Sequence, residues 1–286
     1  MATTVLGLKT FAASDPVDYN EVNDNYNKID NGVKTALQGR AAHNLLDNSD
    51  FRNPVNQRGA TSYSGIVYGI DRWHSWDSNN TTAINDGNIS VSANIVQDIL
   101  QSRFKSGNTY TIALCASDGT IYVNSGVYTP GGEGFGDWTH TWVEPGNSGH
   151  ATVYVRSGTY VWAALYEGSY DASTLPAYQP KGYAAELAEC QRYYLPLNNQ
   201  LLGSGYTFSD GAALLVPRKM RIDAPSFVAS GAIFARVNGA DYLLTLSSVT
   251  TYGSMIKVDF VRNNIPMNYP CVFYSEASSV SLNADL

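Results

Sequence analysis

The chain has 286 residues and a formal net charge of −7, and only 15% of its residues are charged, whereas globular proteins average about 25%. Aromatic residues make up 12%, including 20 Tyr, and because aromatic residues favour strands while Gly and Asn favour turns, this composition is typical of an all-β protein. An acidic chain without a Lys/Arg cluster lacks the basic surface of a nucleic-acid-binding protein, so we expect no nucleic acid as a partner.

The three cysteines, Cys115, Cys190 and Cys271, are far apart in the sequence. No C-x-x-C pair is present, so the sequence predicts neither a metal site nor a cofactor, and a sparse, odd count is typical of a reducing cytoplasm. The N-terminal residues contain no signal-peptide pattern, and the longest apolar stretches are far shorter than the ~20 residues of a membrane-spanning helix. We therefore expect synthesis in the cytoplasm and no membrane insertion.

Residues 1–43 differ from the rest because they predict a helix. Ser14-Asp15-Pro16 is a typical helix start, with a capping residue followed by proline in the first turn. Apolar residues then recur at steps of three and four, as in a short coiled-coil seam: Tyr19, Val22, Tyr26, Ile29, Val33 and Ala36. A single helix of this length needs a partner surface. Two interpretations remain open, packing on the downstream domain and self-association, for which we expect a homotrimer.

From Asn44 onward the apolar period changes to two, which predicts strands. Residues 89–95 and 151–156 alternate, a short helix is expected over 97–104, and residues 159–165 are apolar on both faces and predict a central strand. We expect residues 44–182 to form a jelly-roll β-sandwich.

Residues 183–198 read as a short helical connector, and residues 199–286 as a smaller C-terminal β-sandwich domain. Strands are expected there over 212–216, 226–237, 241–248, 254–261 and 271–275.

Three stretches resemble a known family, the receptor-binding tail proteins (tail fibres, tail spikes and baseplate proteins) of tailed bacteriophages and prophages. The segment 14–30, with Asn25-Tyr26-Asn27-Lys28-Ile29-Asp30, is similar to an attachment segment near the N-termini of these proteins. Asn44 to Phe51, Asn56 to Gly59 and Tyr68 to Trp73 resemble the opening of their carbohydrate-binding-module-like jelly roll. Leu165 to Ser169, Tyr178-Gln179-Pro180 and Glu189 to Tyr194 resemble its closing strand and connector.

The resemblance implies a virion component. Its N-terminus would attach to other tail or baseplate proteins, and its β domains would bind a host cell-surface glycan. On this basis we expect a non-enzymatic structural subunit of the virion tail. The alternatives are a tail-borne polysaccharide depolymerase and a purely architectural baseplate or head-fibre protein.

Aromatic residues are the main candidates for a ligand site in the jelly roll. We expect Trp73 in the core, whereas Trp76 is either exposed or packed. Trp138, His140 and Trp142 have the spacing of residues on one face of a strand, and they form either an aromatic platform for a ligand or part of the inner core.

The C-terminal region supplies the preferred candidates, because the C-terminal part of the resembling proteins points away from the particle. Five aromatic residues lie near Gly, Ser, Asn or Asp in expected turns: Tyr206, Phe208, Tyr242, Tyr252 and Tyr269.

Support for catalysis is weak. Glu133, Asp137 and Glu144 could supply a carboxylate pair for glycoside hydrolysis, but their separation cannot be read from a sequence. We therefore assign no catalytic residue.

Overall fold

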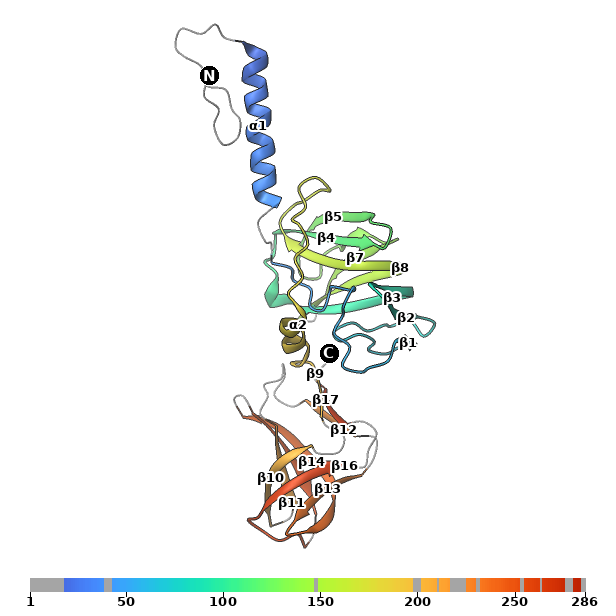
Figure 1. The fold of residues 1–286 in the computed structure, drawn as a ribbon, viewed down its shortest axis with the longest axis vertical. Helices are drawn as coiled ribbons and strands as arrows, with labels where there is room; N and C mark the ends of the chain where they lie inside the picture. Colours follow the sequence, from blue (N-terminus) through green and yellow to red (C-terminus); the bar gives the residue numbers. More distant parts are fainter. Residues whose placement is uncertain are drawn as a thin grey trace, which may run out of the picture.

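The computed structural model describes residues 18–38, 43–146, 149–197, 202–209, 211–216, 225–229, 232–252, 255–262, 264–275 and 280–283. Figure 1 shows three parts that follow one another along the long axis: one helix, an eight-stranded sheet and a closed barrel. The predicted all-β class with a short N-terminal helix is confirmed.

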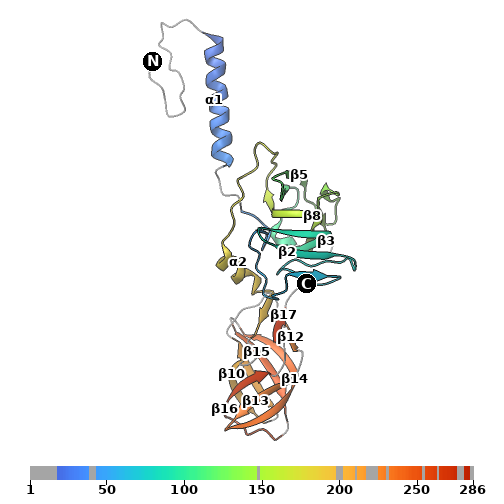
Figure 2. The same cartoon turned by 45° about the vertical axis from the view of Figure 1, so that its right-hand side comes forward.

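Helix α1 (Tyr19–Gln38) carries the predicted apolar stripe. Asp18 begins it, because its carboxylate accepts the backbone N–H of Asn20 at 2.9 Å. The helix continues through Gly32 and stands apart from the sheets in both views (Figures 1 and 2). The exposed fractions of Tyr19 and Tyr26 are 78% and 67%. The side chains of positions 33 and 36 lie outside the described residues, as do the predicted helix start at 14–16 and the rest of the segment before residue 18.

The jelly-roll region consists of one antiparallel sheet bent around a core. Its strands are β1 (Ser62–Ser64), β2 (Thr81–Asn85), β3 (Asn88–Leu100), β4 (Thr109–Ala116), β5 (Ile121–Val127), β6 (Phe135–Asp137), β7 (Thr141–Pro145) and β8 (His150–Glu167). The main order is β1-β2-β3-β8-β4-β5, and β6 and β7 join at β8. The first half of β8 pairs with β3 and β7, whereas its second half pairs with β4. This long strand therefore joins the two halves of the bent sheet. Residues 159–165 lie in a central strand, as predicted, but 151–156 and 159–165 belong to the one strand β8 and not to two.

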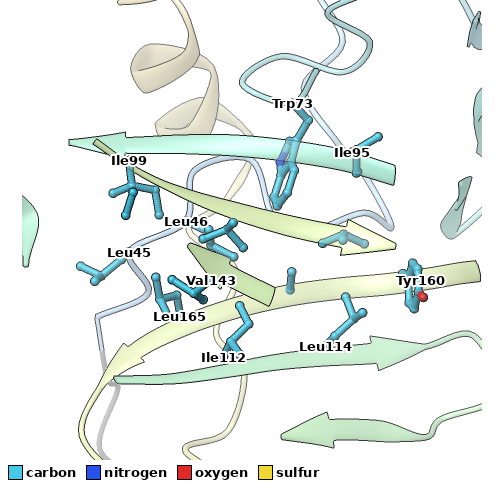
Figure 3. Close-up of a cluster of buried hydrophobic side chains, with 14 of the residues drawn as sticks. Leu45, Leu46, Trp73, Ile95, Ile99, Ile112, Leu114, Val143, Tyr160 and Leu165 are labelled. Carbon is cyan, nitrogen blue, oxygen red and sulfur yellow. The ribbon is translucent and has the colours of Figure 1, made fainter. Parts of the chain in front are cut away.

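The core fills the space enclosed by this bent sheet. Figure 3 shows Trp73, Leu46, Leu114 and Tyr160 among the apolar side chains that gather between the strands. A second cluster covers the outer side of β4 and β8, where Trp162 stacks on Tyr178 with ring centroids 4.7 Å apart. Both faces of the second half of β8 are thus covered, one by the core and the other by this second cluster, which explains why this segment is apolar on both faces.

The helix expected over 97–104 is wrong. Strand β3 continues to Leu100, and only η1 (Gln101–Arg103) is a 3₁₀ turn. Residues 97–100 pair with residues 150–153 of β8, and the buried amide of Gln97 exchanges hydrogen bonds with the backbone of Asp47 at 2.7 and 2.8 Å. Pairing with a distant strand thus overrides the local helical pattern.

The connector contacts both β regions: its helix packs on the jelly roll, and its short strand pairs with a strand of the C-terminal region. Helix α2 (Tyr183–Cys190) contacts the jelly roll through Glu186, whose carboxylate accepts the backbone N–H of Asn48 at 2.8 Å. Strand β9 (Tyr194–Pro196) instead pairs with β17 (Val280–Asn283), which also pairs with β12 (Ser226–Ala229). The predicted domain boundaries remain a prediction.

The C-terminal region contains a closed barrel rather than the expected sandwich. Its strands are β10 (Gly203–Phe208), β11 (Gly211–Val216), β13 (Ile233–Val237), β14 (Ala240–Tyr252), β15 (Met255–Val261) and β16 (Pro270–Ser275). The ring closes because β16 pairs with both β10 and β13. Alternation in sequence is the same for a sandwich and a barrel, so the closure was not predictable. The single strand expected over 226–237 is instead two strands, β12 and β13, in different sheets.

Trp73 and Trp76 offer a matched test of this core. Trp73 has no exposed surface and its indole N–H donates to the carbonyl of Asn48 at 2.9 Å, whereas Trp76 is 51% exposed. We expect Trp73→Ala to lower the free energy of unfolding by about 3–5 kcal/mol, since it leaves a cavity, and Trp76→Ala to change it by less than about 1 kcal/mol. Urea unfolding followed by circular dichroism measures both, and similar values for the two variants would contradict this packing.

Candidate functional site

Four aromatic side chains form a continuous surface on the outside of the jelly roll. Trp142 on β7 and Tyr154 on β8 are paired residues of neighbouring strands. Trp138 lies between them, with its ring centroid 4.9 Å from that of Trp142 and 5.6 Å from that of Tyr154. Trp76 contacts the same tyrosine with its edge, at 6.1 Å. We call these four residues the aromatic surface.

Trp138 reaches this surface from a turn and not from a strand. The Asp137 carboxylate accepts the backbone N–H of Thr139 at 2.8 Å and pairs with Nδ1 of His140 at 2.6 Å. The His140 ring stacks on Tyr122 of β5, with centroids 3.7 Å apart. The prediction that Trp138, His140 and Trp142 share one strand face is therefore wrong. A polar turn built around Asp137 joins β6 to β7. Trp138 and His140 lie on this turn, whereas Trp142 lies on β7.

The core interpretation of these residues does not hold either. Trp138 is 54% exposed, and Trp142 and His140 are partly exposed. Trp142 is held in place from below by Gly134, where a Cβ atom would lie 2.5 Å from the indole Nε1. A larger residue at position 134 would have to displace the ring, so Gly134 lets Trp142 occupy its place in the aromatic surface.

Charged groups border the aromatic surface. The Tyr154 hydroxyl donates to the Glu144 carboxylate at 3.1 Å, and the Arg156 guanidinium lies 5.1 Å from the ring centroid of Trp138. Burial, with the Glu144 charge adding to it, raises the pKa of Tyr154 to about 12, so its hydroxyl keeps its proton. Tyr154 and Arg156 were not among the predicted site residues, and Glu144 was considered only as a carboxylate for glycoside hydrolysis. The alternation of 151–156 indicated that 154 and 156 share a face, but nothing in the sequence paired them with Trp142.

Beneath Trp76 lies a buried polar group centred on Asp98. Its carboxylate accepts the Thr152 hydroxyl at 2.6 Å and pairs with Nε2 of His74 at 3.2 Å. The His74 ring in turn contacts Trp76, with centroids 5.4 Å apart. Burial tends to raise the pKa of Asp98, but hydrogen bonds from His74 and Thr152 outweigh it and hold the pKa below its usual value of 3.8. The ionised carboxylate therefore supports the segment that carries Trp76.

A second cluster lies on the barrel, in a groove of about 370 Å³ lined by Tyr206, Phe208, Ser248, Lys257 and other side chains. Lys257 pairs with Asp259 at 2.8 Å and its Nζ lies 5.8 Å from the centre of the Phe208 ring. We call this the barrel groove.

The barrel groove brings together only part of the predicted C-terminal set. Tyr206 and Phe208 line it from β10, whereas Tyr242 packs against the barrel core from β14. Tyr269 is exposed beside β10, because its backbone hydrogen-bonds with Thr207. The side chain of Tyr252 lies outside the described residues. The expected placement at loop tips is wrong for Tyr206, Phe208 and Tyr242, which lie on strands.

Within the described part of the chain, no three His, Cys, Asp or Glu side chains are grouped in a way that could hold a metal ion. No described helix has the length and apolar character to cross a membrane. Neither the sequence nor the fold matches any known family model, curated protein or solved structure.

The Asp98 pKa predicts how stability depends on pH. Because the folded-state pKa is lowered, the ionised carboxylate adds stability above pH 3.8, its ordinary pKa, and this stability is lost as the pH falls through the folded-state pKa. We expect Asp98→Asn to weaken folding at pH 7 and to flatten the acid-side loss of stability. Urea unfolding at a series of pH values measures this, with Asp24→Asn on α1 as the exposed control. An unchanged acid-side slope in Asp98→Asn would contradict the assignment.

Proposed function

We propose that this chain is a non-enzymatic, glycan-binding structural subunit of a bacteriophage-type tail, as the family resemblance implies, and that the aromatic surface is its glycan site. The observation that carries the proposal is the pair of half-exposed indoles, Trp76 and Trp138, on either side of Tyr154. A contiguous exposed aromatic patch is uncommon in a monomer and indicates a binding surface.

The chemistry of the aromatic surface suits sugars. An indole ring offers a flat apolar face that can cover the C–H face of a pyranose, and it loses little side-chain entropy because the ring is rigid. Gly134 and the Asp137 turn hold Trp142 and Trp138 before any ligand arrives. Glu144 and Arg156 lie at the edges, where they can hydrogen-bond sugar hydroxyl groups.

The aromatic surface is a better candidate than the barrel groove. The barrel groove contributes two aromatic rings, Tyr206 and Phe208, whereas the aromatic surface contributes four that touch one another. The larger rings of tryptophan also cover more of a sugar. We therefore propose the jelly roll as the main binder, in place of the C-terminal region that the sequence favoured.

Helix α1 supplies the proposed attachment and oligomerisation element. Val22, Tyr26 and Ile29 line a shallow groove of about 340 Å³ on its surface. These apolar residues follow the predicted seam, and a parallel trimer would bury them. Three linked copies would then present three glycan sites, which raises the effective concentration at a cell surface and compensates for weak single-site binding.

Substitution of Trp138 tests the glycan site. We expect Trp138→Ala to weaken binding to bacterial surface polysaccharides by about tenfold or more, because a central aromatic contact is lost. Glycan-array binding with purified protein measures this, and Tyr206→Ala, an exposed aromatic residue of the barrel, is the control and should keep the wild-type affinity. The reverse result would move the site to the barrel groove. Release of reducing ends from the same polysaccharides by the wild-type protein would instead indicate a depolymerase.

Sedimentation tests the role of α1. We expect the full chain to sediment as a trimer at micromolar concentration and the double variant Tyr26→Asp/Ile29→Asp as a monomer, since charges cannot be buried in the seam. Asn27→Asp, which adds a charge outside the seam, should remain trimeric. A wild-type monomer in analytical ultracentrifugation would refute self-association through α1.

A further inference from the structure

A cavity separate from the aromatic surface lies between the jelly roll and the connector. Its volume is about 530 Å³, which is within the range of small-molecule sites. The jelly roll contributes Asp47, Leu100, Arg103 and Lys181 to its wall, and the connector contributes Ala185, Glu189, Arg192 and Tyr193. His43 lies at its margin. We call this the connector cavity.

Cations outnumber carboxylates at this wall. The described wall residues include three cationic side chains, Lys181, Arg103 and Arg192, and two carboxylates, Asp47 and Glu189. Asp47 is buried and lies 3.1 Å from Lys181 and 3.4 Å from Arg103, and it also lies 3.6 Å from Arg72, which does not line the cavity. Arg192 pairs with Glu189 at 2.9 Å, and Glu186, which does not line the cavity, lies 4.0 Å from Lys181. The wall therefore carries one more cation than carboxylates. In a chain with a net charge of −7, this local excess of positive charge is unusual.

Hydrogen-bond donors also remain available in the connector cavity. Among the described residues, the Arg103 side chain donates only to Asp47, through one nitrogen, and that of Arg192 only to Glu189. Each guanidinium has five N–H groups, so most of those donors have no acceptor among the described residues. Both side chains are partly exposed and can reach a ligand.

We infer that the connector cavity binds a carboxylate-bearing sugar, such as a uronic acid unit of an acidic polysaccharide. A carboxylate accepts paired N–H groups from a guanidinium, the geometry that Arg103 and Arg192 leave unused. The Tyr193 ring and Leu100 add apolar wall against which a sugar ring can pack. The choice of a sugar, rather than any other small carboxylate, rests on the proposed glycan-binding function.

The test uses the full chain with D-glucuronate as the probe and D-glucose as the neutral match. We expect glucuronate, and not glucose, to bind in isothermal titration calorimetry. Arg103→Gln should weaken this binding by about tenfold, since a charge-assisted hydrogen bond is lost. Arg192→Gln should act in the same direction. Because the partner of Arg192 among the described residues is the exposed Glu189, this variant should leave the melting temperature unchanged. Arg236→Gln, at an exposed ion pair on the barrel, is the control and should bind as the wild type.

Two results would overturn the inference: no glucuronate binding at millimolar concentrations, or binding that survives both Arg103→Gln and Arg192→Gln. Acetate binding as tightly as glucuronate would overturn the assignment to a sugar. Trp138→Ala separates this inference from the proposed function, because it should weaken polysaccharide binding at the aromatic surface while leaving glucuronate binding intact. Loss of both activities in Trp138→Ala would mean that there is one site and not two.

Discussion

The jelly roll depends on the buried residue Asn48, whose side chain and backbone connect to three other segments of the chain, at residue 55, at 71–73 and at 186. Its amide donates to the carbonyls of Val55 and Asp71 and accepts the N–H of Val55, while its own backbone bonds Glu186 and Trp73. The backbone at Asn48 has a φ of 51°, which asparagine tolerates better than most residues. Removing this side chain would leave several buried polar groups unpaired, each at a cost of about 1–3 kcal/mol. Through these hydrogen bonds, Asn48 attaches the long segment that precedes β2 to the core of the jelly roll.

The segment that begins at residue 71, which Asn48 binds, contacts both proposed ligand sites, the aromatic surface and the connector cavity. Arg72 is buried and stacks on Tyr193, a wall residue of the connector cavity, with 3.5 Å between the guanidinium carbon and the ring centroid. Trp73 enters the core, His74 forms a bridge to Val96 of β3, and Trp76 reaches the aromatic surface. Six consecutive residues thus connect the core with two candidate ligand sites. A change in the core at Trp73 would therefore disturb both sites, whereas a change at either site can leave the core intact.

The pattern of apolar residues along the sequence correctly predicted the strands whose residues alternate between buried and exposed. The alternation along 151–156, the central strand over 159–165 and the buried position of Trp73 are all found in the structure. Prediction failed where distant pairing decides the outcome. Residues 97–100 have a helical pattern but pair with 150–153, and the barrel closes because β16 joins β10 and β13. Such pairings depend on the free energy of contacts between strands that are far apart in the sequence. A short stretch of sequence read by itself contains no information about these contacts.

The amino-acid sequence by itself determined the all-β class, the apolar stripe of α1 and the residue types of the candidate sites, because composition and periodicity follow directly from side-chain chemistry. Tertiary structure alone decided which of those residues meet. Trp76, Trp138 and Tyr154 come from separate segments and become neighbours only when β7 and β8 pair and the Asp98 group holds the 74–76 segment. The connector cavity likewise exists only because α2 packs against the jelly roll and places Lys181 beside Asp47. A site assembled from distant residues depends on the register and packing of the whole domain, and these are global properties of the folded chain.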